Sequence, residues 1–213
     1  MNIRIGKALI AAGVVTAMSL PVATQASDGT ITFTGAVTAS TCTVAVGGNS
    51  TTNAGGIAGN GTVSLPTVSS SSLPNDATKT PGDTGAGTFF NMAVSGCTAA
   101  SDIGGSAPTH VEIYFEAGPN VDQATGGLIN TAASGSNVEV RLYNASGSSV
   151  VGTQILPGVQ GAAGNQPTAI PIANVTSATV TQWFYAGYST AGANAAATAG
   201  AVNTSVTYSL IYD

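Results

Sequence analysis

The sequence predicts an all-β fold of the sandwich type. Clusters of Gly, Ser, Thr, Asn and Pro interrupt the chain about every ten to fifteen residues, as expected for short strands joined by turns. Two segments alternate strictly between apolar and other residues, and no segment keeps a helical period between capping residues. Several short alternating strands are typical of two packed sheets.

The clearest predicted strand is residues 110–116, HVEIYFE. Val111, Ile113 and Phe115 occupy every second position, so one face of this strand is expected in the core and the other, which includes His110, in water.

A second strand is predicted over residues 137–143, NVEVRLY, with the same period of two. Its aliphatic residues are expected to point inward, and Glu139 and Arg141 are expected to face solvent. Weaker candidates are β-branched or aromatic runs bounded by turn residues, at 41–46, 61–65, 88–94, 150–156, 168–172 and 180–188.

Two low-complexity stretches separate these strands. Residues 47–87 are rich in Gly, Ser, Thr and Pro, and residues 189–201 are mostly Ala, Gly and Thr, so both are expected to be loops. No composition shift or fixed-period repeat marks a second domain. We therefore expect a single domain after the N-terminal segments.

The first 26 residues have the features of a secretory signal peptide. Arg4 and Lys7 precede an uncharged apolar run, which ends before Pro21 and a stretch of small residues. The run is shorter than the ~20 residues that span a bilayer. We expect cleavage after Ala26 and an exported mature protein.

Composition excludes two classes of function. The formal net charge is −5, with 4 Lys plus Arg against 9 Asp plus Glu, whereas a nucleic-acid partner requires a basic surface. With 1 His and 2 Cys, the usual four-ligand structural zinc site cannot form. No metal and no cofactor are expected.

Cys42 and Cys97 are the two cysteines of the chain. In an oxidising exported compartment, an even pair most simply forms one disulfide. Closing a loop of this length stabilises the fold by roughly 4 kcal/mol in the chain-entropy model. The alternative, a catalytic thiol, would have to use His110, and we favour the disulfide.

The C-terminal segment alternates over an unusual length. By itself this pattern is also compatible with an ordinary final strand. The residues on its one face are Gly200, Val202, Thr204, Val206, Tyr208, Leu210 and Tyr212.

The segment just after the predicted cleavage site alternates in the same way. Ile31, Phe33, Gly35 and Val37 share one face of residues 27–39, a segment that ends shortly before Cys42. From the pattern alone, this could be the first strand of the sandwich.

Taken together in order and spacing, these motifs resemble those of chaperone–usher (type 1-like) fimbrial major pilin subunits of Gram-negative bacteria. The resemblance covers about residue 28 to 213. It rests on DGTITFTGAV before Cys42, the pairing cysteine Cys97, VEIYFEAGPNVDQATGGLIN, VEVRLYN, and the C-terminal AGAVNTSVTYSLIYD with its penultimate Tyr212.

The resemblance implies an incomplete immunoglobulin-like sandwich that lacks its seventh strand, with residues 40–213 as the pilin domain. Residues 27–39 would be a donor strand that fills the groove of a neighbouring copy, an instance of strand addition. Ile31, Phe33 and Val37 would occupy successive pockets, and Gly35 would allow close backbone approach. The alternating C-terminal strand would border the groove.

The implied partners are other copies of the chain, a periplasmic chaperone and an outer-membrane usher, and the implied location is the cell-surface fimbrium. A host-cell receptor is left open. Two alternatives to the shaft subunit are carried forward: a minor, adaptor or tip adhesive subunit, and a secreted non-enzymatic β-sandwich binding module.

Enzyme chemistry is not expected. A serine-type triad would depend on His110, which is predicted to face solvent. Glu112 and Glu116 would lie about 13 Å apart along a strand, beyond the carboxylate spacing of glycosidases.

Overall fold

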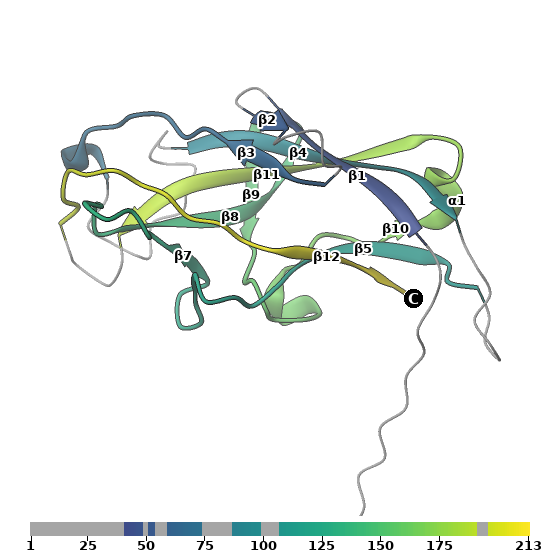
Figure 1. Cartoon of the computed structure of the whole chain (residues 1–213). Helices are drawn as coiled ribbons and strands as arrows, with labels where there is room; N and C mark the ends of the chain where they lie inside the picture. The colour runs from purple at the N-terminus through teal and green to yellow at the C-terminus, as the bar shows by residue number, and fades with distance from the viewer. Residues whose placement is uncertain (1–40, 49–50, 54–58, 74–86, 99–106, 191–195) are drawn as a thin grey trace, which may run out of the picture. The chain divides into compact units, whose positions relative to one another are not determined.

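The computed structural model describes residues 41–48, 51–53, 59–73, 87–98, 107–190 and 196–213, and the account below concerns these ranges (Figure 1). They all belong to the unit Ala36–Asp213. The predicted signal peptide (1–26) and donor segment (27–39) lie outside the described residues.

The larger sheet contains strands in the order β1-β4-β11-β8-β7-β6, with β9 paired to β8, and its neighbours are antiparallel. Its strands are β1 (Thr41–Gly48), β4 (Gly87–Thr98), β6 (Val121–Asp122), β7 (Gly127–Ile129), β8 (Val138–Ser146), β9 (Val150–Gln154) and β11 (Thr179–Thr190).

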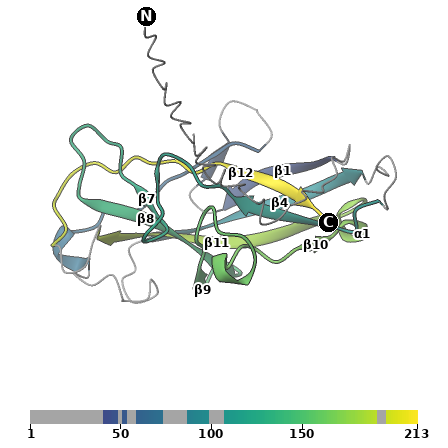
Figure 2. The same ribbon diagram turned by 90° about the horizontal axis from the view of Figure 1, so that it is seen from below.

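A second layer is the antiparallel sheet β10-β5-β12, and β2 pairs with β3 in a short ribbon (Figures 1 and 2). These strands are β2 (Thr51–Asn53), β3 (Gly61–Val63), β5 (His110–Phe115), β10 (Ile170–Pro171) and β12 (Tyr208–Tyr212). The described helices are short: η1 (Ser70–Ser72), η3 (Ala162–Gly164) and α1 (Ile172–Val175). None of them is long and apolar enough to cross a bilayer.

Aromatic contacts join the two layers at the centre of the core. Phe184 of β11 is fully buried, with its ring centroid 5.3 Å from Phe90 of β4 and 5.5 Å from Phe115 of β5. Edge and tilted contacts of this kind stabilise beyond simple area burial. The core is thus that of a two-sheet sandwich, as predicted.

Most predicted strands are confirmed because their alternation matches the burial pattern. Val111, Ile113 and Phe115 are all buried, as expected for one face of β5. The segments predicted at 61–65, 110–116 and 150–156 contain β3, β5 and β9, those at 41–46, 88–94 and 180–188 lie within β1, β4 and β11, and 137–143 overlaps β8.

Three local predictions are wrong. The stretch 168–172 forms only the two-residue β10 before α1 begins, where Ile172 and Val175 bury one helical face and Thr176 bonds back to Ile172. The predicted loop 47–87 contains the short strand β2. The predicted loop 189–201 begins with the last two residues of β11, because their pairing with β8 continues to Thr190.

The prediction that Glu139 and Arg141 face solvent is also wrong, since they are only 4% and 6% exposed. The Thr125 hydroxyl donates to Glu139 Oε2 at 3.0 Å, and Arg141 Nη2 lies 3.8 Å from the same oxygen. The Glu139 carboxylate also packs directly against Gly127, where a Cβ would not fit. Contacts from residues 125–127 therefore cover the Glu139 carboxylate on the outer face of β8.

Burial raises the pKa of Glu139 above its ordinary value, and the nearby Asp122 acts in the same direction, whereas Thr125 and Arg141 oppose the shift. The folded protein therefore binds this proton more tightly than the unfolded chain. We expect the free energy of unfolding to fall as the pH rises from about 4 through the raised folded pKa of Glu139. Urea unfolding of Glu139→Gln across this range should show a weaker pH dependence.

Glu116→Gln serves as the control because Glu116 lacks the contacts with Thr125 and Arg141. The pKa of Glu112 is raised mainly by burial and to a smaller extent by Asp213. Glu112 therefore makes the free energy of unfolding fall with rising pH in every variant. If the free energy of unfolding of Glu139→Gln changed with pH as it does in the unsubstituted chain, Glu139 would not be a source of this pH dependence.

Candidate functional site: an apolar groove beside the C-terminal strand

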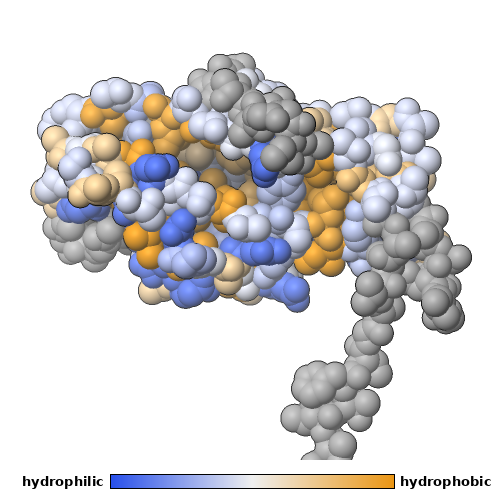
Figure 3. Space-filling view, in the orientation of Figure 1, coloured by the Kyte–Doolittle hydropathy of each residue, from blue (hydrophilic) through white to orange (hydrophobic). Residues whose placement is uncertain are grey.

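A cavity of about 1140 Å³ lies between the two layers of the sandwich. One wall is formed by β1 and residues 59–65, and the other by residues 202–210. Apolar side chains are visible between polar ones on this face (Figure 3). The apolar floor includes Phe90, Met92, Phe115, Leu128, Val140 and Leu142.

The wall of residues 202–210 keeps the predicted alternation, although only β12 is paired as a strand. The inward side chains are half-buried, and the apolar ones pack against the main core. Those that line the cavity are Val202, Thr204, Val206, Tyr208 and Leu210, whereas Gly200 and Tyr212 are outside the lining.

The main chain of this wall is hydrogen-bonded along one edge. Asn203 O accepts from Thr131 N at 2.8 Å, and Thr207 O accepts from Glu116 N at 2.9 Å. Because successive residues of an extended chain direct their amides to opposite edges, those of Val202, Thr204 and Val206 face the groove. Within the described residues, β12 and β1 are each the edge strand of their sheet. The groove thus lies between two edges.

Thr204 adds a polar feature to this wall. Among the described residues, its hydroxyl oxygen is buried and has no hydrogen-bond partner. Leaving such a group unpaired costs about 1–3 kcal/mol. Among the described residues, the groove therefore contains an unsatisfied polar group beside its apolar lining.

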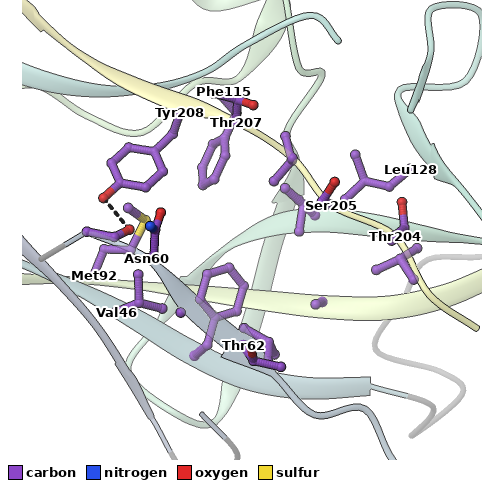
Figure 4. A pocket seen from close by; sticks show the side chains of 18 of the residues that line it. Val46, Asn60, Thr62, Met92, Phe115, Leu128, Thr204, Ser205, Thr207 and Tyr208 are labelled. Atoms are coloured by element: carbon purple, nitrogen blue, oxygen red, sulfur yellow. Dashed lines mark hydrogen bonds between the residues drawn. The ribbon is translucent and has the colours of Figure 1, made fainter. Parts of the chain in front are cut away.

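A tyrosine side chain crosses the groove. The Tyr208 hydroxyl donates to the carbonyl oxygen of Gly59 on the opposite wall at 2.7 Å (Figure 4). Nearer the C-terminus, Tyr212 interacts with the main chain of Cys42. Burial raises the pKa of both phenols, and for Tyr212 the Cys42 contact partly opposes the shift.

The disulfide predicted between Cys42 and Cys97 is confirmed. It links β1 to β4 at a register shift between Thr41 and Thr43. One end of the β1 wall is therefore covalently held to the body of the sheet.

Gly200 contacts the backbone before the C-terminal wall begins. A Cβ at this position would lie 2.5 Å from Ser136 N and 2.7 Å from Gly135 C. Ser136 N also donates to Ala201 O at 3.1 Å, so the two segments are in direct main-chain contact. A close backbone approach explains glycine here.

The geometry around His110 does not form a catalytic relay. Thr109 Oγ1 lies 2.8 Å from His110 Nδ1, and Asp213 Oδ1 lies 3.8 Å from the same ring nitrogen. A triad needs the nucleophile and the acid on different ring nitrogens. His110 is half-exposed, in agreement with its predicted position on the wet face of the strand.

Comparison with known proteins identifies the family. The family model for type-1 fimbrial protein A matches residues 65–213, which include most of the groove and its C-terminal wall. The chain belongs to this family. It is a fimbrial subunit, and such subunits are exported to the cell surface as fimbriae.

Three relatives in the same class are similar over nearly the whole chain. The F17 fimbrial protein of Escherichia coli is 37% identical over 192 residues, covering 89% of this chain and 90% of the relative. The major fimbrial subunit SMF-1 of Stenotrophomonas maltophilia is 34% identical over 196 residues, covering 91% and 97%. The serotype 2 fimbrial subunit of Bordetella pertussis is 30% identical over 210 residues, covering 89% of each.

The alternation of residues 202–212 and the strand signals at 41–46 and 61–65 cover much of both walls, but the pattern alone does not place them beside a groove. Gly59 and Asn60 of the opposite wall lie in a Gly-rich stretch predicted as loop and carry no strand signal. Gly59 and Gly61 approach Tyr208 and Val46 too closely to accept a Cβ, so glycine content was the available signal.

The close approach of Gly200 generates a stability prediction. Gly200→Ala should lower the free energy of unfolding by about 1–3 kcal/mol, because the added methyl meets backbone atoms that cannot move independently. Gly118→Ala is the matched control, since nothing lies within 4 Å of a Cβ built there. Equal urea midpoints for the two variants would contradict this account of Gly200.

Proposed function

We propose that the chain is a structural, non-catalytic shaft subunit whose groove is filled by residues 27–39 of another copy. The observation that carries this proposal is the apolar groove between two sheet edges, lined on one side by half-buried core side chains. An edge with unpaired amides and exposed apolar surface favours pairing with an additional strand.

The donor segment has the pattern that such a groove needs. Ile31, Phe33 and Val37 alternate on one face, so they would enter the apolar space while the intervening residues point outward. Gly35 would allow the donor backbone to approach the wall closely. Main-chain groups of the inserted strand would also come within reach of the unpaired Thr204 hydroxyl.

A donor strand on one copy and a groove on the next make a heterologous, head-to-tail contact. Contacts of this type do not close on themselves and build a filament. The apolar side chains buried at each junction would make dissociation slow, so that persistence of the fibre is kinetic.

The same groove requires cover before assembly. Following the family resemblance, a periplasmic chaperone would lend a strand to the C-terminal wall, and an outer-membrane usher would host the exchange. The residues assigned to this wall are Gly200, Val202, Thr204, Val206, Tyr208, Leu210 and Tyr212. Gly200 and Tyr212 would support the wall rather than line the cavity.

A shaft role is favoured over a minor, adaptor or tip role. The Stenotrophomonas maltophilia relative carries the name of a major fimbrial subunit, and it is covered over 97% of its length.

Deletion of residues 27–39 tests the proposal directly. A chain without this segment should fail to polymerise because it has no strand to donate, but its groove should still bind a synthetic peptide of residues 27–39. We expect the peptide to raise the Tm of the deleted chain. Of the two chains, we expect only the full one to form filaments visible by electron microscopy. Filaments formed by the deleted chain would refute the donor assignment.

A substitution in the groove wall tests the acceptor side. Val206→Gln places an amide among apolar side chains and should weaken peptide binding at least about fivefold, the effect expected for one poorly satisfied buried polar group. Thr207→Gln is the matched control because the Thr207 side chain is exposed. Peptide affinities are measured by fluorescence anisotropy. Equal affinities for Val206→Gln and Thr207→Gln would mean that the donor segment does not bind along this wall.

A further inference from the structure

The hydrogen bond between Tyr208 and Gly59 spans the groove in which the donor strand is proposed to lie. Tyr208 belongs to β12 on one wall, and Gly59 precedes β3 on the other. The phenol oxygen and the carbonyl oxygen are 2.7 Å apart, and the ring points across the cavity (Figure 4). The two residues are 149 positions apart in the chain, so the contact is a tertiary one.

The opposite wall is shaped to make this contact. Gly59 has a φ of +95°, a conformation that glycine adopts without strain. A Cβ on Gly59 would lie 2.7 Å from the Tyr208 hydroxyl, and a Cβ on Gly61 would lie 2.6 Å from Cβ of Val46. Glycines at both positions therefore allow this segment to lie close to β1 and to Tyr208.

The contact conflicts with insertion of a strand. A strand placed between the walls needs roughly 4.8 Å on each side for main-chain pairing, with alternate side chains directed into the core. The Tyr208 ring occupies part of that side-chain layer. Its hydroxyl also occupies the Gly59 carbonyl, an acceptor on the wall that the inserted strand would face.

We propose that Tyr208 is a gate residue, whose hydrogen bond to Gly59 must open before the groove accepts a strand. This inference rests on the proposed function of the groove. The bond holds the walls of the vacant subunit together and slows uptake. Once the donor is in place, the ring packs against the donor side chains instead. Tyr208 thus sets the rate of strand uptake, in addition to lining the site.

The test compares chains that lack residues 27–39, so that no neighbouring copy fills the groove, in their uptake of a fluorescent synthetic peptide of residues 27–39 added in large excess. Tyr208→Phe keeps the ring but removes the hydroxyl, and it should accelerate uptake about 2- to 12-fold, the factor that corresponds to one net hydrogen bond. Gly59→Ala breaks the same bond from the other wall and should also accelerate uptake.

Tyr114→Phe is the matched control, because it removes a phenol hydroxyl outside the groove. Tyr114 lies on β5 and is not among the residues that line the cavity. The uptake rate of this variant should stay within about twofold of that of the unsubstituted chain, because substitutions away from a site usually have small effects.

The outcomes separate this inference from the proposed function. Faster uptake in Tyr208→Phe and Gly59→Ala, with Tyr114→Phe unchanged, supports the gate. Equal uptake by every variant, or slower uptake by Tyr208→Phe, refutes the gate while leaving the donor groove intact. Absence of uptake by the unsubstituted chain refutes the proposed function itself, and the gate with it.

Discussion

One feature organises the described part of the structure: two sheet edges face each other across an apolar space. A finished sandwich would bury this space with a strand, pairing its main chain and covering the core side chains. Among the described residues, the wall around Val206 is hydrogen-bonded along the edge that faces Thr131 and Glu116. The disulfide holds one end of the other wall, β1, to β4 in the body of the sheet.

Much of this arrangement could be predicted because it is encoded at short range. Alternation over 110–116 and 202–212 identifies faces of strands directly, since side chains on a strand have a period of two. The disulfide followed from the count of cysteines and the expected compartment. What turned these patterns into a groove was the resemblance to a fimbrial family, because periodicity alone is equally compatible with a complete sandwich.

The remaining features depend on contacts between distant parts of the chain. Glu139 and Arg141 sit at polar positions of an alternating strand, and contacts from other segments, such as Thr125 and Gly127 on the Glu139 carboxylate, are not visible in that pattern. Tyr208 and Gly59 carry no mutual signal in the sequence, because their contact depends on how two separate walls approach. Local patterns report which face is inward, but they do not report which strand lies on either side.

The burial of Arg141 has a consequence for proteolysis. The chain contains 4 Lys plus Arg, and Arg141 is the only one within the described ranges. It lies in the middle of β8 and is 6% exposed, so trypsin cannot reach the following bond while that strand is paired. Cleavage there requires the sheet to open, and its rate follows the stability of the fold when reclosing is fast relative to cleavage. The rate of tryptic cleavage after Arg141 therefore measures how often the sheet opens at β8.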